Sequence, residues 1–414
     1  MIYKERLLEK EINELFKVFQ VVAICGPRQS GKSTMLKNLK GKWEYFNLDD
    51  RVIRNKIVND VDLFVRDFQS NIIIDEAQKI PDLFHAIKAI VDKGFPHKII
   101  LSGSSNFLLL QSITESLAGR IGILELLPFS FSEASSIKSS EYMSDILHST
   151  DINELHKKIK NKKQVAESEL IDFILYGGFP KIHSLDNVSL KERWFQGYIT
   201  TYIEKDIRDL MRIANLGDFQ NVYNILAYRT GNVLNLSNIS SDIGVNIGTL
   251  KNYLQLLESS YQYKKIFPFL STPKKSITKH PKIFGFDTGM LNFILKNFDR
   301  ERMFNSGFWG NILETWVFSE IYKSIKDLSS KPNLNFYRTK NHAEVDFVLR
   351  SGKKLIPIEV KTSYQISHLH LRGINSFMDS YDSYDIPYGI VIHRGEKVSF
   401  LSDKILGLPI TLIY

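Results

Sequence analysis

The chain has 414 residues, of which 43% are hydrophobic and 24% are charged, with a formal net charge of +8 and one cysteine. The chain is too long for one ordinary hydrophobic core, so we expect about two to four domains. The single cysteine excludes intramolecular disulfides and a multi-cysteine metal site. The positive net charge is compatible with DNA binding but does not establish it. The charged N-terminus lacks a signal-peptide core and no apolar run is long enough for a bilayer span, so we expect a cytoplasmic protein with no membrane partner.

A glycine-rich segment at residues 26–33, Gly-Pro-Arg-Gln-Ser-Gly-Lys-Ser, has the spacing of a phosphate-binding loop. The apolar residues 21–25 before it predict a buried strand, and residues 34–40 after it have a helical pattern. A phosphate would lie at the helix N-terminus, where free N–H groups and the helix dipole favour an anion. We therefore expect Lys32 to reach the β- and γ-phosphates of ATP and Ser33 to ligate Mg²⁺; the alternative is a glycine turn that binds nothing. The residues expected to contact ATP in this loop are Gly26, Pro27, Arg28, Gln29, Ser30, Gly31, Lys32, Ser33 and Thr34.

Two further apolar strands end in polar side chains. The run Asn71–Glu76 ends in two carboxylates, and ligands gather at the carboxyl ends of parallel strands. We expect Asp75 to hold the water shell of Mg²⁺ and Glu76 to polarise a water for attack on the γ-phosphate; solvated acids at a strand end are the alternative. Another strand ends at Ser102, which, ahead of Asn106, is our candidate for contacting the γ-phosphate.

These segments resemble the AAA-type ATPase domain at the N-terminus of a bacterial and archaeal family of uncharacterised ATP-binding proteins, and the resemblance covers nearly the whole chain. Its marks are GPRQSGKST at 26–34, IIIDEAQKIPDLF at 72–84, LSGSSNFLL at 101–109 and ESLAGRIGILELLPFSFSE at 115–133. The resemblance implies that Arg120 is a charge-stabilising finger, acting in cis or across a subunit interface, and the second case would require a homo-oligomer. Arg28 and Arg6 are weaker candidates, and a solvated surface arginine is the alternative.

The middle of the chain offers a second pattern. Residues 140–170 have few apolar positions and are interpreted as a connection with a charged helix. Residues 234–268 have a helix-turn-helix outline, with Ser237 as the N-cap of the first helix, Gly244 at the turn and a strand as a wing. Residues 251–282 contain seven lysines and a single acid, Glu258. This excess of positive charge fits a domain that contacts DNA phosphates or, equally, a domain that packs against other protein parts. These lysines are Lys251, Lys264, Lys265, Lys274, Lys275, Lys279 and Lys282. Farther on, Asp287 is interpreted as a helix N-cap.

Three charged side chains near the C-terminus form a third pattern. Asp346 lies on one predicted strand, and Glu359 and Lys361 lie on one face of the next strand after a hairpin turn. Glu314, on an upstream amphipathic helix, is a further candidate ligand. Carboxylate oxygens suit Mg²⁺, which would activate water, and Lys361 would offset developing charge. The alternative is ordinary alternation with charged residues facing solvent.

This C-terminal segment resembles the domain that accompanies the ATPase in the same family, which is similar to the PD-(D/E)xK nuclease superfamily; many members of that superfamily keep the fold with a degenerate site. We therefore expect a multidomain α/β protein. Its parts are a P-loop parallel-sheet ATPase domain at 1–135, a helical connecting region at 136–230, a winged-helix-like domain at 231–290 and a restriction-endonuclease-like domain at 300–414.

The favoured function is ATP binding and hydrolysis, with the nucleotide state controlling a DNA-binding C-terminal half that would cleave DNA with Mg²⁺. A second interpretation is an ATP-dependent switch or scaffold, in which an inactive nuclease-fold domain binds DNA or a protein partner. A third is a motor that remodels protein.

Overall fold

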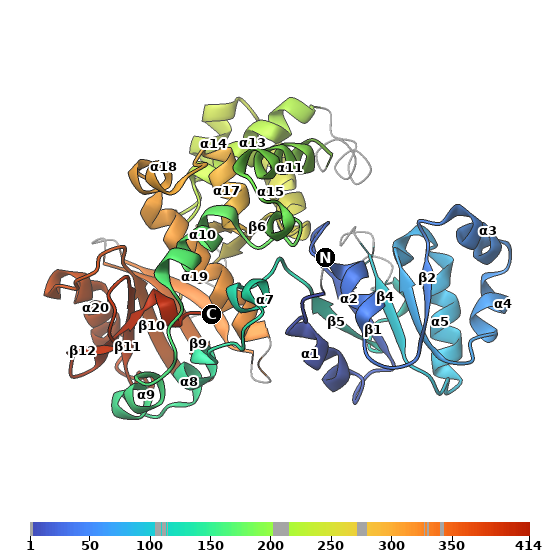
Figure 1. Ribbon diagram of the computed structural model, residues 1–414, viewed down its shortest axis with the longest axis horizontal. Coiled ribbons are helices and arrows are strands. Elements are labelled where there is room, and N and C mark those ends of the chain that lie inside the picture. Colours follow the sequence, from blue (N-terminus) through green and yellow to red (C-terminus); the bar gives the residue numbers. More distant parts are fainter. Residues whose placement is uncertain are drawn as a thin grey trace.

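The computed structural model describes residues 3–103, 109, 113, 115–201, 215–270, 280–326, 328, 331–339 and 343–414 (Figure 1). A blue N-terminal sheet lies on one side, a group of green to orange helices lies above, and a second, orange and red sheet lies on the other side. Among the residues so described, none of the helices combines the length and apolar character that a membrane crossing needs.

The N-terminal sheet consists of five strands in the order β2-β3-β4-β1-β5, and its neighbouring strands all pair in parallel, as the sequence predicts. The strands are β1 (Val21–Cys25), β2 (Trp43–Asn47), β3 (Asn71–Asp75), β4 (Ile99–Ser102) and β5 (Ile121–Glu125). Because the carboxyl ends of parallel strands meet at one edge, the glycine-rich loop after β1 and the acids that end β3 lie at the same edge. β4 lies between them, so its last residue, Ser102, is placed between the loop and the acids.

Helices cover both faces of this sheet, which explains why its central strands are continuous apolar runs. On one face α1 (Leu8–Leu15) and α2 (Lys32–Asn38) pack against Val22 and Ile24. On the other face α3 (Arg51–Asn59), α4 (Val61–Arg66) and α5 (Asp82–Asp92) pack against Val21 and Ala23.

Residues 140–170 belong to the core, so the prediction of a mere connection was wrong. They form α8 (Tyr142–His148), α9 (Ile152–Ile159) and the start of α10 (Glu167–Tyr176), after the short α7 (Phe131–Ser135). Most of their few apolar residues recur at helical spacing and are buried. Ile146 and Leu155 are fully buried in the cluster that includes the C-terminal strands, and the Tyr388 hydroxyl donates to the Ile146 carbonyl.

The middle of the chain is mainly helical. Its elements are α11 (Val188–Thr201), α13 (Leu216–Tyr228), α14 (Leu236–Ile243), α15 (Ile247–Ser259), β6 (Tyr263–Ile266), β7 (Lys282–Gly285), α17 (Thr288–Ile294) and α18 (Arg300–Asn305). The predicted helix-turn-helix is present, with Gly244 at φ 77° between α14 and α15. Ser237 is not its N-cap, because α14 begins one residue earlier and the Asn235 side chain accepts from the Asn238 N–H. β6 pairs antiparallel with β7.

The C-terminal part is a six-stranded mixed sheet in the order β12-β13-β11-β10-β9-β8. Its strands are β8 (Asn333–Arg338), β9 (Glu344–Ser351), β10 (Lys354–Val360), β11 (Gly389–His393), β12 (Ser399–Ser402) and β13 (Ile405–Pro409). The predicted hairpin is present, with β9 and β10 antiparallel around Gly352 at φ 63°. The long helix α19 (Trp309–Lys326) packs against one face, and α20 (Arg372–Ser380) against the other.

Candidate nucleotide site and C-terminal carboxylate cluster

The glycine-rich loop has the backbone shape that its sequence predicts. Gly26 has φ 148°, and a Cβ there would lie 2.1 Å from the Leu126 carbonyl oxygen, so no larger residue fits. Gly31 has φ 97° immediately before α2, and Gln29 also takes a left-handed conformation. The loop is therefore shaped for close approach of backbone N–H groups to phosphate oxygens.

Lys32 lies folded back over this loop. Its ammonium is buried and donates to the carbonyl oxygens of Gly26 and Pro27, both at 2.8 Å. Burial lowers the pKa of Lys32 to about 8, although the nearby carboxylates of Glu76 and Asp75 favour its charged form. Ser33 is exposed in the first turn of α2, next to this ammonium in sequence.

Asp75 is held in one orientation from two neighbouring strands. Its side chain is 1% exposed, and the Tyr45 hydroxyl on β2 donates to its Oδ2 at 2.6 Å. The Ser102 hydroxyl at the end of β4 donates to Oδ1. Ser102 thus lies in the site as predicted, but its described contact is with Asp75, and its γ-phosphate contact stays a prediction. The other candidate, Asn106, lies outside the described residues.

Glu76 occupies a backbone conformation that non-glycine residues rarely adopt, with φ 60°. Such residues gather at functional sites, because the surrounding structure must hold them in place. Its carboxylate accepts a hydrogen bond from Gln78 Nε2 at 2.7 Å and acts electrostatically on Lys32. The carboxylate therefore lies on the loop side of the strand end.

The charge of Lys32 predicts a pH dependence of nucleotide binding. Phosphates attract the ammonium form, so ATP binding must raise a pKa that burial holds at about 8. Above about pH 8, binding should take up a proton and the affinity should fall, by up to about tenfold per pH unit. Calorimetry in two buffers of different ionisation enthalpy measures both quantities. An affinity that does not change above about pH 8 would contradict the assignment.

Arg6 supports the loop from behind rather than acting as a finger. It is buried, its Nε lies 3.0 Å from Glu133, and its other nitrogens donate to the carbonyls of Ser30 at 2.8 Å and Leu127 at 2.7 Å. Although burial alone would raise the pKa of Glu133, the Arg6 guanidinium holds it below its usual value. This weaker finger candidate is thus committed to holding the loop in place.

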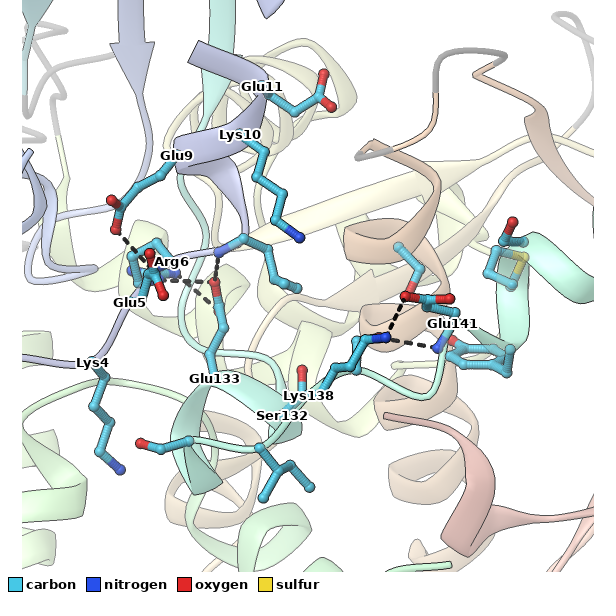
Figure 2. A pocket seen from close by; sticks show the side chains of 18 of the residues that line it. Lys4, Glu5, Arg6, Glu9, Lys10, Glu11, Ser132, Glu133, Lys138 and Glu141 are labelled. Atoms are coloured by element: carbon cyan, nitrogen blue, oxygen red, sulfur yellow. Dashed lines mark hydrogen bonds and ion pairs between the residues drawn. The ribbon is translucent and has the colours of Figure 1, made fainter. Parts of the chain in front are cut away.

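Figure 2 shows a pocket that Arg6 lines, with Arg6 and Glu133 paired at its wall. Its volume is about 690 Å³, and it lies between α1, the segment 132–144 and the end of α19. The predicted ATP residues do not line it. Lysines and glutamates are mixed along its walls, so it favours no ligand of one charge.

Arg120 lies at the wrong edge of the sheet to act in cis. It immediately precedes β5, whose first residue pairs with Val21 at the start of β1, whereas the loop follows the end of β1. Five residues of strand separate the two edges, or about 16 Å. Its guanidinium instead pairs with Asp92, with Nε 2.5 Å from Oδ1. The cis role is therefore wrong, and a role across a subunit interface stays a prediction.

A glycine turn connects the middle of the chain to the ATPase part. The Phe129 N–H donates to the Gly178 carbonyl at 2.8 Å, and the Gly178 N–H donates to Asp287 Oδ2 at 2.7 Å. A Cβ on Gly178 would lie 2.2 Å from the Phe129 carbonyl oxygen. Asp287 caps α17, as predicted, by accepting from the Met290 N–H.

The predicted C-terminal residues come together, but around a lysine. The ammonium of Lys282, on β7, lies 2.9 Å from Glu314 Oε1, 2.7 Å from Glu344 Oε1 and 3.3 Å from Asp346 Oδ1. Burial alone would lower the pKa of Lys282, but these three carboxylates outweigh burial and raise it. Lys282 is one of the seven lysines for which DNA contact and packing were equal alternatives; because it is only 2% exposed, packing is the alternative that holds for this residue.

The other two predicted residues form a neighbouring pair. Lys361 Nζ lies 2.5 Å from Glu359 Oε1, and Asp346 Oδ2 accepts from the Val360 N–H at 2.9 Å. Burial, and next the Asp346 carboxylate, raise the pKa of both Glu314 and Glu359. Among the described residues, no three histidine, cysteine or acidic side chains are arranged to hold a metal ion. The expected Mg²⁺ site at Glu314, Asp346 and Glu359 is thus not formed in this arrangement.

The other six lysines of the set between residues 251 and 282 give weaker support for a DNA-binding surface than the sequence indicated. Lys264 and Lys265 both pair with Glu258, at 3.4 and 3.1 Å. Lys251 is exposed on α15. Three others, Lys274, Lys275 and Lys279, lie outside the described residues.

Sequence reasoning missed three members of these sites. Tyr45 follows no motif and reaches Asp75 only because β2 lies beside β3. Glu344 begins the strand that carries Asp346, and its period-two spacing from Asp346 was a usable signal. Lys282 could have been separated from the other lysines, since Ile283 and Phe284 follow it and predict a buried strand.

Comparison with known proteins divides the chain into three stretches. Residues 18–135 match the family described as an AAA domain, whereas residues 167–301 and 309–413 match two domains of unknown function (DUF8612 and DUF4143). An uncharacterised protein of Mycobacterium tuberculosis is 25% identical over 394 residues, which cover 94% of this chain and 80% of that protein. An uncharacterised protein of Methanocaldococcus jannaschii is 25% identical over 375 residues, which cover 86% of this chain and 78% of that protein.

Among solved structures, the Walker-type ATPase of Pyrococcus abyssi is similar, with 14% identity and a TM-score of 0.46, covering 71% of this chain and 96% of that one. The loop, Asp75 and Glu76 all lie within the stretch that matches the AAA family. Residues 18–135 are therefore similar to the AAA domain family.

Proposed function

We propose that this protein binds Mg²⁺ and ATP and hydrolyses ATP at the loop between β1 and α2. The observation that carries the proposal is the convergence of Lys32, Asp75 and Glu76 at one sheet edge. The glycine conformations leave room for phosphate oxygens, and the hydroxyl of Ser33 with the carboxylate of Asp75 are the oxygen donors that Mg²⁺ takes in such sites. The residues present thus fit the nucleotide and its metal.

In this proposal each side chain has a separate task. Lys32 leaves the carbonyls of Gly26 and Pro27 and donates to the β- and γ-phosphates. Ser33 and Asp75 hold Mg²⁺, which when bound neutralises developing charge on the phosphates. Glu76 orients a water through its carboxylate and receives the water's proton. Tyr45 and Ser102 keep Asp75 in place.

For the C-terminal half we favour the scaffold interpretation over Mg²⁺-dependent cleavage, so that the nucleotide state acts on a domain that binds DNA or a protein partner. The specific support is Lys282, whose ammonium lies where the carboxylates would need a divalent ion. The nucleotide site could act on the rest of the chain through Gly178, because this residue forms hydrogen bonds with Phe129 of the ATPase part and with Asp287 at the start of α17.

Loss of Lys32 should abolish stabilisation by nucleotide. Mg·ATP binds the folded state, so at about 100 times the dissociation constant it should stabilise the wild type by about 2.7 kcal/mol and raise its melting temperature. Lys32→Ala should show no such shift, measured by thermal denaturation with and without Mg·ATP. Lys40→Ala, an exposed lysine just after α2, should behave as wild type. An equal shift in Lys32→Ala would rule out this loop as the nucleotide site.

A further inference from the structure

Lys282 is a cation enclosed by carboxylates from another part of the chain. It belongs to β7, whereas Glu314 lies on α19 and Glu344 and Asp346 lie on β9. Carboxylate oxygens are also the protein ligands that Mg²⁺ takes. The distances differ: Mg²⁺ takes its oxygens at about 2.0–2.1 Å, while this ammonium lies 2.7 to 3.3 Å from its oxygens.

Acidic side chains outnumber basic side chains in this region. Glu359 adds a fourth carboxylate, and Lys361 adds a second ammonium at 2.5 Å from it. Glu359 is 7% exposed, and its second oxygen, Oε2, is buried and accepts no hydrogen bond from the described residues. The cluster therefore depends on the charge of Lys282 and has the oxygen chemistry to receive a stronger cation.

The backbone around Lys282 is fixed, so its ammonium is not at the end of a loose segment. The Gly231 N–H donates to the Ile283 carbonyl at 2.8 Å, and the Thr230 and Thr315 hydroxyls, both buried, lie 2.8 Å apart. The rings of Phe284 and Phe318 stack at 4.8 Å. These contacts join β7 and its neighbours to α19 and set the position of the ammonium.

We propose that Lys282 is the resident cation of this cluster: the chain itself supplies the positive charge, and the docked lysine keeps divalent metal ions out. The lysine thereby joins the middle part to the C-terminal part. The cluster is a cation site in chemistry, but it opens to Mg²⁺ or Mn²⁺ only when the Lys282 ammonium is removed. This inference is independent of ATP hydrolysis, because the two sites share no residue.

The test is Mn²⁺ binding to the nucleotide-free full chain. Asp75→Asn serves as the background, so that the ATP site cannot contribute a metal. Free Mn²⁺ is measured by electron paramagnetic resonance, and the background protein should bind none at this cluster. Lys282→Met keeps the length of the side chain but not its charge, and should gain one site with a dissociation constant at least about tenfold lower than any residual binding. Adding Asp346→Asn should remove the gained site.

Two results would overturn the proposal. One is Mn²⁺ bound by the background protein and lost with Asp346→Asn, because metal would then enter despite Lys282. The other is a folded Lys282→Met that gains no site. If Lys282→Met does not fold, the Lys282→Arg variant is tested in its place. A folded arginine variant that binds no Mn²⁺ at the cluster supports the need for a cation at this position. An arginine variant that misfolds and is not rescued by Mn²⁺ contradicts the proposal.

Discussion

Replacement of Glu76 by glutamine should slow ATP hydrolysis by about 10²–10⁴-fold while ATP binding is kept. Glutamine preserves the size of the side chain and can keep the contact with Gln78, but it cannot take a proton from the attacking water. The expected result is therefore a large fall in kcat with little change in the dissociation constant of ATP. Steady-state phosphate release and equilibrium titration with ATP measure the two quantities separately.

Glu44→Gln is the matched control, since Glu44 is an exposed glutamate on β2 that lies away from the loop and should leave both quantities unchanged. If Glu76→Gln hydrolyses ATP at the wild-type rate, another group activates the water. A fall in affinity without a fall in kcat would instead make Glu76 a binding residue.

Replacement of Lys282 by alanine should destabilise the protein by about 3–5 kcal/mol, the cost of removing one partner from a buried ion pair. Three carboxylates would then face one another without their shared cation. Urea denaturation followed by tryptophan fluorescence should show an earlier transition. Lys251→Ala, an exposed lysine on α15, should change stability by no more than about 0.5 kcal/mol.

A second substitution tests the cause of that loss. Adding Glu344→Gln to Lys282→Ala removes one of the repelling charges, so the pair of changes should cost less than the sum of the two single changes. Additive costs would show that Lys282 contributes packing rather than charge.

The nucleotide site was predictable because its parts are local in sequence. Gly26, Lys32 and Ser33 lie within one loop, and Asp75 and Glu76 end one apolar strand, so pattern alone located them and the parallel sheet brought them to one edge. The position of Arg120 was predictable in principle too. It precedes a strand, and a residue before a parallel strand lies at the edge opposite to the loop.

The C-terminal cluster was harder to predict from the sequence, because the lysine at its centre, Lys282, comes from a different part of the chain. Asp346, Glu359 and Lys361 were found from strand alternation. Lys282 lies 32 residues from Glu314 and 64 from Asp346, and in a lysine-rich stretch its charge does not distinguish it from the other lysines of the sequence. The pairing of Arg6 with Glu133, 127 residues apart, was missed for the same reason: no local pattern reports a distant ion pair.

The turn at Gly178 limits how this protein can be cut or recombined. A fragment that ended at residue 135 would lose the carbonyl that accepts from the Phe129 N–H, and a fragment that began after the turn would leave the buried Asp287 carboxylate without the Gly178 N–H. Each buried polar group left unpaired costs about 1–3 kcal/mol. The boundary between the first two family matches, at 18–135 and 167–301, therefore does not separate independent modules. We expect that relatives exchange these stretches together, and that a stable expression fragment must include both sides of the turn.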